Sequence, residues 1–465
     1  MKKIILITIA LALCALMLSA CFGGGTGDAA HLLELSFADA REVFSTTLTR
    51  NANNQNRIPE PPQGVFDLVY YQSNVGPLAA YVSSDPGDGE RHPLIIWVVG
   101  GWSNGISDLP WSYGEWDNDQ TAYAFKEAGI LMMYPSFRGA NGNPGYFESL
   151  YGEIDDIVAA FEFAASLPYV DPTRIYLGGH STGATRVLLA AAYTDKFRAI
   201  FSFGPVDNIA EHNQTQFTFN LRDEQERVMR SPIYWLDDIK TPTFIIEGQH
   251  GNASSLRNMQ NRTTNENVFI HIVQGGDHFD ILAPITRLAA QKILADTGAD
   301  VNISFTDREL QDAMNQPPIS PMPILIPHYN ETLDVSFSLP FIWDMHPDTP
   351  SSFVYVASHF DDNFWESSIM YLDVYDIENV MSIEQIAAEL GVDNHEVYQL
   401  QASMINGQEV LVWLGTAEFD GVAYFHKMAV FQANNQLTVF EFFVPNAHRN
   451  ASNNLFGRII NSVSI

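Results

Sequence analysis

Short runs of apolar residues bounded by glycine or proline are the clearest pattern in the chain. Pro93–Val99 and Ile130–Pro135 are continuous runs of this kind, which predicts strands buried on both faces of a sheet. Gly64–Ser73 and Pro77–Ser84 predict an antiparallel pair joined by a tight turn. Four further strands are expected at Arg174–Gly179, Ala199–Val206, Thr243–Gly248 and Val268–Gln274.

Helical patterns fall between these strands. Apolar residues recur at helical spacing over Gly152–Ser166, and Asn118–Ala128 predicts another helix that ends at Gly129. Ala38–Thr49 predicts a short helix before the first strand. Strands that alternate with helices over residues 64–300 predict an α/β fold: an eight-stranded, mainly parallel sheet with helices on both faces.

The pattern changes after residue 300. Residues 316–327 hold five prolines, so we expect a Pro-rich linker over 301–328. Segments that alternate in hydrophobicity follow it, with a helical stretch at Ile383–Leu390. Residues 329–465 are therefore expected to form a smaller α+β domain with an antiparallel sheet.

The first residues predict export. Two lysines precede the apolar run Ile4–Leu18, and Leu18-Ser19-Ala20-Cys21 is typical of a bacterial lipobox. Residues 1–21 are thus expected to be a lipoprotein signal, with the lipid on Cys21 anchoring the protein to the cell envelope membrane. The alternative is a plain cleavable signal with an incidental cysteine. Residues 22–63 would be a tether and lead-in to the first domain.

Charge and cysteine content narrow the class of protein. A net charge of −31 argues against nucleic acid as a partner, because phosphate binding needs clustered Lys and Arg. Besides Cys21 there is only Cys14, inside the expected signal, so no disulfide is expected in the mature domains. No H-E-x-x-H or similar spacing occurs, and we expect neither a metal nor a cofactor.

One motif carries chemistry. The expected strand at 174–179 runs into Gly179-His180-Ser181-Thr182-Gly183 and then into a helical pattern, which is the strand-to-helix context in which G-x-S-x-G presents a nucleophilic serine. Ser181 is the candidate nucleophile. His278, which follows the last expected strand, is its candidate general base. His180 and His250 are expected to be structural.

An acyl-transfer site also needs N–H donors for the developing oxyanion. Thr182, directly after the serine, would supply one of them. The other is expected from Gly101 or Trp102 in the loop after the strand Pro93–Val99, where two adjacent glycines allow the backbone to approach a substrate. The alternative is that these glycines only turn the chain.

These residues lie in stretches with a family resemblance. MMYPSFRGANGNPGYF, GEIDDIVAAFEFAASLPYVDPTRIYLGGHSTGATRVLLAAAY and GGDHF are similar to the catalytic domain of the prolyl oligopeptidase and dienelactone hydrolase branch of the α/β-hydrolases. The resemblance covers about half the chain. It implies a Ser-His-acid triad that hydrolyses esters or peptides, with Ser181 and His278 at the matching positions.

The triad acid stays open at this stage. The family usually has Gly-x-x-Asp after the seventh strand, and here Gly251 occupies the aspartate position. Glu247 at the end of that strand is the first candidate, and Asp207 after the sixth strand is the second. A dyad without an acid is also possible, because the acid supports the base without entering the bond chemistry.

Substrate selection is expected from local insertions, since no β-propeller precedes the hydrolase. Ile209–Trp235 would be a cap over the site. Its three arginines could meet a substrate carboxylate or simply form a solvated face. The C-terminal domain resembles the small α+β domains of the Mog1 and PsbP type. The sequence therefore predicts a serine hydrolase for an ester or peptide, and the alternative is a degraded hydrolase shell that acts as a binding or scaffold lipoprotein.

Overall fold

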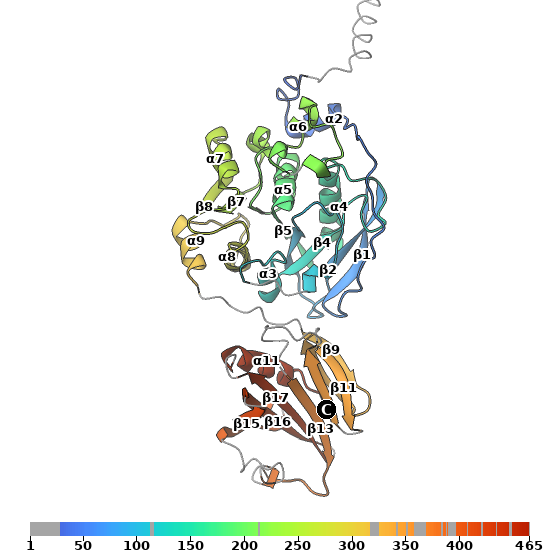
Figure 1. Ribbon diagram of the computed structural model, residues 1–465, viewed down its shortest axis with the longest axis vertical. Coiled ribbons are helices and arrows are strands. Elements are labelled where there is room, and N and C mark those ends of the chain that lie inside the picture. The colour runs from blue at the N-terminus through green and yellow to red at the C-terminus, as the bar shows by residue number, and fades with distance from the viewer. Residues whose placement is uncertain are drawn as a thin grey trace, which may run out of the picture.

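A computed structural model gives the architecture of the chain (Figure 1). It describes residues 28–316 apart from 112–115 and 213, and residues 325–464 apart from 341–342, 350–351, 358–368, 383–384, 387, 389–396, 407, 420–421, 434 and 446–448. Cys21 lies outside the described residues. Among those described, no helix has both the length and the apolar character needed to cross a membrane.

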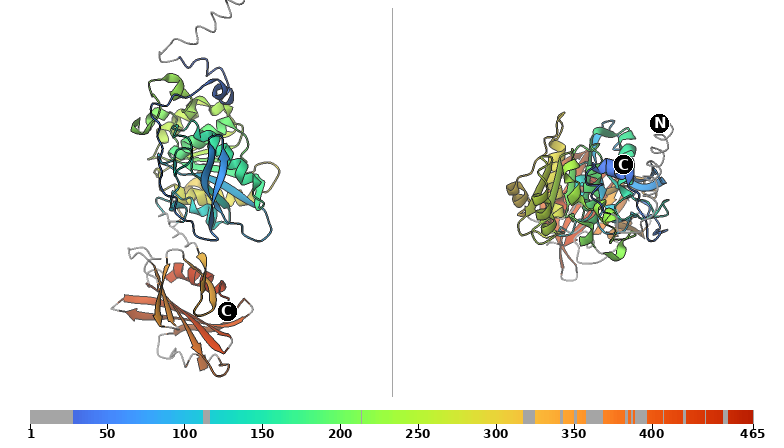
Figure 2. Two further views of the ribbon diagram at one scale, coloured as in Figure 1. Left: turned by 90° about the vertical axis from the view of Figure 1, so that its right-hand side faces the viewer. Right: turned by 90° about the horizontal axis from the view of Figure 1, so that it is seen from above.

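The first domain is built on an eight-stranded sheet, which confirms the predicted fold class. Its strand order is β1-β2-β4-β3-β5-β6-β7-β8. β2 pairs antiparallel with both β1 and β4, and all the other pairs are parallel. The strands are β1 Phe66–Ser73, β2 Gly76–Ser83, β3 His92–Val98, β4 Leu131–Pro135, β5 Val170–His180, β6 Ile200–Phe203, β7 Thr243–Gly248 and β8 Val268–Val273. Figures 1 and 2 show β1 and β8 at opposite edges.

Helices cover both faces of this sheet because the buried strands are apolar on both sides. One core cluster joins the sheet to α2, α4, α5 and α7, and the other joins it to α3, α8 and α9. The helices are α2 Phe37–Val43, α3 Tyr123–Glu127, α4 Glu153–Ser166, α5 Thr182–Tyr193, α6 Glu224–Val228, α7 Ala253–Arg262, α8 Leu282–Ala295 and α9 Asp307–Met314. The helix expected at Ala38–Thr49 is shorter than predicted and ends at Val43.

Two segments that the sequence placed outside the α/β domain pack onto it. In the lead-in, Phe37 and Ala40 are fully buried, and the backbone N–H of Phe37 donates to Asp238 Oδ2 at 2.8 Å. In the expected linker, Phe305 and Leu310 join the core cluster on the other face. The sequence boundaries at 64 and 300 were therefore too narrow, because the expected linker contains α9 and both flanks supply apolar side chains that cover the sheet.

The second domain is α+β, as predicted. It consists of a β9–β10 hairpin, a seven-stranded antiparallel sheet in the order β11-β12-β13-β17-β16-β15-β14, and the terminal helix α11. Its core includes Phe440 and Phe442 from β17 with Phe456 and Ile459 from α11. The predicted helix at Ile383–Leu390 falls largely outside the described residues. The elements are β9 Leu325–Asn330, β10 Val335–Pro340, β11 Trp343–Thr349, β12 Ser352–Ala357, β13 Ile369–Asp376, β14 Val397–Ile405, β15 Gln408–Phe419, β16 Val422–Ala433, β17 Gln436–Pro445 and α11 Arg449–Asn461.

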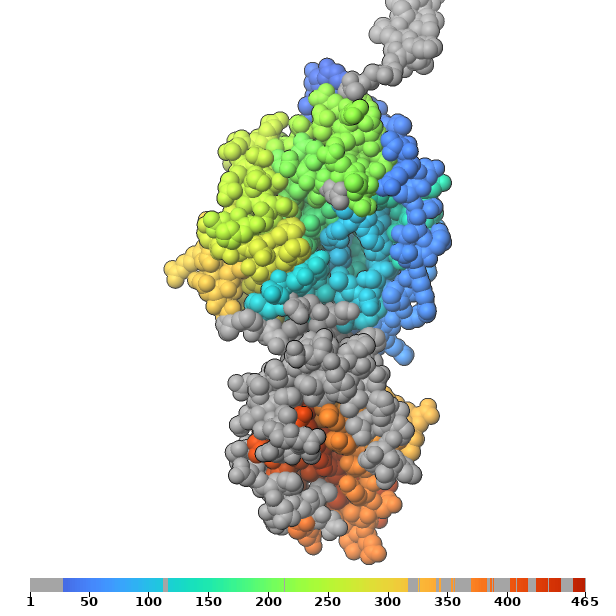
Figure 3. Space-filling model, in the orientation of Figure 1, coloured from blue at the N-terminus to red at the C-terminus, as the bar shows by residue number. Residues whose placement is uncertain are grey.

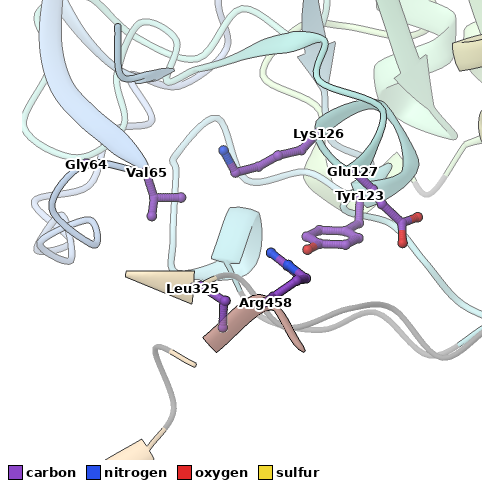
Figure 4. A pocket seen from close by; sticks show the side chains of 7 residues that line it. All are labelled: Gly64, Val65, Tyr123, Lys126, Glu127, Leu325 and Arg458. Carbon is purple, nitrogen blue, oxygen red and sulfur yellow. The ribbon is translucent and has the colours of Figure 1, made fainter. Parts of the chain in front are cut away.

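A cavity of about 420 Å³ lies where residues of both domains meet (Figure 4). Tyr123 and Lys126 of α3 line it together with Leu325 of β9 and Arg458 of α11. Burial lowers the pKa of Lys126 to about 8. None of its described lining residues belongs to the candidate site described next, so the two are separate.

Candidate active site

Ser181 stands at a sharp turn between β5 and α5. Its backbone has φ 56° and ψ −120°, a strained conformation for a residue with a side chain. Two backbone hydrogen bonds hold it there: its N–H donates to Phe203 O at 2.8 Å, and its carbonyl accepts from Thr185 N at 3.0 Å. Gly183 is required beside it, because a Cβ there would lie 2.1 Å from Val98 O. The turn thus presents the hydroxyl at the carboxyl end of the sheet.

His278 is held by a buried carboxylate. Its Nδ1 lies 2.8 Å from Glu247 Oε2, and Glu247 is fully buried at the end of β7. The carboxylate also accepts from the backbone N–H of Gly248 at 2.6 Å and of Asn252 at 2.9 Å. An ionised carboxylate accepts only, so Nδ1 of His278 carries the proton and donates. Nε2 of the neutral ring is then free to accept a proton.

Gly204 brings the serine and the histidine together. It follows Phe203, whose carbonyl binds Ser181 N, and its own N–H donates to Ile246 O at 2.9 Å. A Cβ at Gly204 would lie 2.6 Å from Cε1 and Nδ1 of His278, so the ring packs directly against this glycine. No hydrogen bond joins Ser181 Oγ to His278 among the described residues. Such contacts are often long in a free enzyme and shorten when the substrate binds.

His180 supports the loop that carries His278. Its Nε2 lies 2.9 Å from the backbone carbonyl of His278, which can only accept, so Nε2 is the donor. The two imidazole rings lie 4.5 Å apart. Burial, aided by electrostatic repulsion from the nearby His278, lowers the pKa of His180 to about 3. His180 is therefore a neutral residue that positions the loop. The backbone N–H of His250 donates a hydrogen bond to Gly276 O.

The loop after β3 lies against the serine. A Cβ at Gly100 would lie 3.1 Å from Cβ of Ser181, so the Gly100 backbone passes close to the candidate nucleophile. Gly101 has φ 82°, and its carbonyl accepts from the Thr182 hydroxyl. Trp102 points its ring into an aromatic group with Phe147, His212 and Phe217. Gly100, more than Gly101 or Trp102, is the residue of this loop that the geometry puts beside Ser181.

Comparison with known proteins finds a family model that matches the part of the chain that holds this site. Residues 116–280 match the profile of the prolyl oligopeptidase family. These residues carry a prolyl oligopeptidase family domain. Ser181, Glu247 and His278 all lie inside this domain.

Individual relatives are distant or cover a short part of the chain. The polyketide transferase claH of Penicillium crustosum is 40% identical over 95 residues, which are 20% of this chain and 31% of that protein. Solved structures that are similar include a Mycobacterium tuberculosis puromycin-hydrolyzing peptidase (19% identity, TM-score 0.41, 51% of this chain and 40% of that chain) and a Pyrococcus horikoshii acylaminoacyl peptidase (18%, 0.41, 53% and 44%). A Pyrobaculum calidifontis esterase is 15% identical with a TM-score of 0.38, covering 51% and 87%.

The second candidate acid lies elsewhere in the prolyl oligopeptidase family domain. Asp207 Oδ2 accepts from Asn258 Nδ2 at 3.1 Å, and its backbone carbonyl accepts from Ile233 N. These contacts join the start of the cap segment to α7. Among the described residues, Asp207 makes no hydrogen bond to His278, whereas Glu247 does.

The cap segment lies beside the loop after β3. Figure 3 shows its green residues next to the cyan part of the surface, in agreement with the contacts of Trp102 to His212 and Phe217. Of its arginines, only Arg222 is exposed. Arg230 is fully buried, pairs with Glu226 and donates to Glu148 O, so the prediction of a solvated arginine face was wrong for this residue. It stabilises the cap.

Sequence reasoning missed two residues near Ser181. His212 lies with Nε2 3.3 Å from Thr185 Oγ1, and burial lowers its pKa to about 4. Arg186, one turn of α5 after Thr182, is buried beside the loop after β3. The sequence could have indicated Arg186, because an arginine interrupts a helix of otherwise apolar and small residues that has to be buried.

Proposed function

We propose that the protein is a serine hydrolase that cleaves an ester or peptide bond through an acyl-enzyme on Ser181. The observation that carries the proposal is the contact of His278 with the buried Glu247, 2.8 Å apart, packed against the backbone that holds the strained Ser181. A positioned carboxylate, an imidazole and a serine at a strand-to-helix turn are the parts that acyl transfer requires.

The chemistry follows from these positions. His278 Nε2 takes the Ser181 proton while Oγ attacks the substrate carbonyl, and the backbone N–H groups of Thr182 and of the Gly100–Trp102 loop face the oxygen that becomes negative. His278 then gives the proton to the leaving alcohol or amine, and an acyl-enzyme remains. Water, deprotonated by the same imidazole, attacks the acyl group, and the proton returns to Ser181. Glu247 stabilises the imidazolium without taking the proton.

A fluorophosphonate probe tests the nucleophile. We expect the wild type to be labelled covalently and Ser181→Ala to remain unlabelled, and we expect hydrolysis of 4-nitrophenyl butyrate to fall at least about a thousandfold in that variant. Circular dichroism of both proteins controls for folding. Absence of labelling in folded wild-type protein would instead favour the scaffold lipoprotein.

The acid is tested by two isosteric amides. Glu247→Gln removes the charge next to His278, and we expect kcat to fall by about two to four orders of magnitude. Asp207→Asn is the matched control, because it alters a carboxylate that contacts Asn258 in the same domain. A larger loss in Asp207→Asn than in Glu247→Gln would contradict the assignment.

A further inference from the structure

A cavity of about 440 Å³ adjoins the candidate active site. Its wall comes from the carboxyl ends of β3 and β4 and from the loop 103–110, and it includes Trp97, Tyr134 and Phe137. Two arginines, Arg57 and Arg186, line it, and no aspartate or glutamate is among the described lining residues. The cavity wall is therefore positively charged, although the chain as a whole has a net charge of −31.

Arg186 is the unusual group in this wall. Its side chain is 1% exposed, and its guanidinium makes one hydrogen bond with the described residues, from Nη2 to Asn104 Oδ1 at 3.1 Å. Nε has no partner. The flat face lies over the Phe137 ring, with Cζ 4.7 Å from its centroid. A buried guanidinium with five donors normally pairs with an anion, because its desolvation is otherwise costly.

One nearby carboxylate is fully engaged, and the other has one oxygen, Glu153 Oε2, without a hydrogen-bond partner. Asp156 binds Arg138 and Ser73, and Glu153 Oε1 accepts from Asn104 and from the backbone of Glu148. Neither forms an ion pair with Arg186, and both act on it only through longer-range attraction. The remaining guanidinium donors therefore have no anion among the described residues.

The position of the cavity tells which part of a substrate would reach it. In the sheet, β5 with Ser181 at its end lies between β3 and β6. His278 packs on Gly204 after β6, whereas Gly100, which touches Ser181, forms part of the cavity wall on the β3 side. The leaving group must receive a proton from His278 and so lies on the β6 side. The acyl part of the substrate then lies on the β3 side, where the cavity is.

We propose that this cavity binds a carboxylate on the acyl part of the substrate, with Arg186 as the residue that recognises it. Arg186 and Arg57 supply the positive charge, and the aromatic wall holds the carbon chain between the carboxylate and the reacting carbonyl. The inference rests on the proposed function, because it needs an acyl-enzyme on Ser181. The substrate class is an acyl group that ends in, or carries, a carboxylate.

Two esters with the same leaving group test this. The kcat/KM values are measured for mono-4-nitrophenyl glutarate, which is anionic, and for 4-nitrophenyl butyrate, which is neutral. We expect the wild type to favour the anionic ester and Arg186→Gln to lower the ratio of the two values by about tenfold or more, because a charge-assisted bidentate contact is lost. An equal ratio in wild type and Arg186→Gln would overturn the inference.

A second variant leaves Arg186 in place. Ser103 lines the cavity, is exposed and accepts from Gly105 N, a role that an aspartate can keep. Ser103→Asp adds a negative charge to the wall and is expected to lower the same ratio. Ser254→Asp adds the same charge at an exposed position in the first turn of α7 and is expected to leave the ratio unchanged. This pair of variants tests the carboxylate site if Arg186→Gln fails to fold.

A third measurement distinguishes failure of the proposed function from failure of the carboxylate site. Thermal unfolding is followed with and without free glutarate, and we expect glutarate to raise the Tm of the wild type but not of Arg186→Gln. Such a shift without Ser181-dependent turnover of either ester would reject the serine hydrolase and with it the acyl assignment. Ser181-dependent turnover of the butyrate ester with an Arg186-independent ratio would reject only the carboxylate site.

Discussion

Two histidines near Ser181, one buried and one half-buried, are uncharged in the folded protein at neutral pH. Burial, together with electrostatic repulsion from His278, lowers the pKa of His180 to about 3. Burial, with His278 and Arg186 nearby, lowers the pKa of His212 to about 4. Both values lie below the pKa of about 6.5 that a histidine has in an unfolded chain. Protonation therefore favours the unfolded state.

This shift predicts how stability depends on pH. Since the folded pKa values are depressed, the unfolded chain binds more protons below about pH 6.5, and the free energy of unfolding falls as the pH drops from there towards 4. Each histidine contributes up to about 1.4 kcal/mol per pH unit. Urea unfolding of His180→Gln between pH 6.5 and 4.5 should show a shallower slope than the wild type. The exposed His31→Gln is the control, and equal slopes in wild type and His180→Gln would refute the account.

Gly204 predicts a second effect at single-residue scale. It has φ 66°, and a Cβ there would meet both His278 and Glu247 Oε2 within 2.7 Å. Gly204→Ala should displace the imidazole and lower kcat at least about a hundredfold. Gly275→Ala is the matched control, because it has φ 75° but nothing within 4 Å of the added Cβ. Both variants carry backbone strain, so a kcat that falls equally in both would contradict a specific role for Gly204.

At the scale of elements, α9 shows that residues after 300 belong to the first domain. Thr306 and Glu309 form a capping box at its start, and Lys292 of α8 lies 2.5 Å from Glu309. Leu310 is 1% exposed and belongs to the same core cluster as Phe244 of β7. The helix thus closes the apolar face of the sheet next to β8.

The packing of α9 predicts a measurable stability loss. Leu310→Ala should lower the free energy of unfolding by about 2–4 kcal/mol through lost burial and a residual cavity. Arg308→Ala on the same helix, where the side chain is 91% exposed, should change it by less than about 0.5 kcal/mol. Chemical denaturation of the full-length chain measures both. A small effect of Leu310→Ala would mean that α9 is not part of the cooperative unit.

At the scale of the whole molecule, the expected lipid anchor predicts where the protein resides. Cys21→Ser removes the thiol that would be acylated, and we expect the protein to lose labelling by radioactive palmitate and to leave the membrane fraction of an expressing bacterium. Cys14→Ser keeps Cys21 and is the control. A membrane-bound, unlabelled wild type would contradict the lipoprotein prediction.

The sequence by itself determined the strands of the first sheet and indicated the candidate serine. The apolar runs of the sheet and the G-x-S-x-G between Gly179 and Gly183 are local patterns, because a buried strand or a tight turn restricts residues that are adjacent in the chain. It also predicted the α+β character of the second domain. The boundaries at 64 and 300 could not be set in this way, since Phe37 and Leu310 contact the sheet only through the tertiary fold.

Only the tertiary structure decided which carboxylate meets His278 and what lies beside the nucleophile. Glu247 and Asp207 were both acceptable by chain position, and the difference is a 2.8 Å contact between residues that are 31 positions apart. Arg186 became notable only when its partners could be counted. Contacts of this kind depend on how strands are ordered and twisted in the sheet, and a pattern along the chain does not encode that spacing.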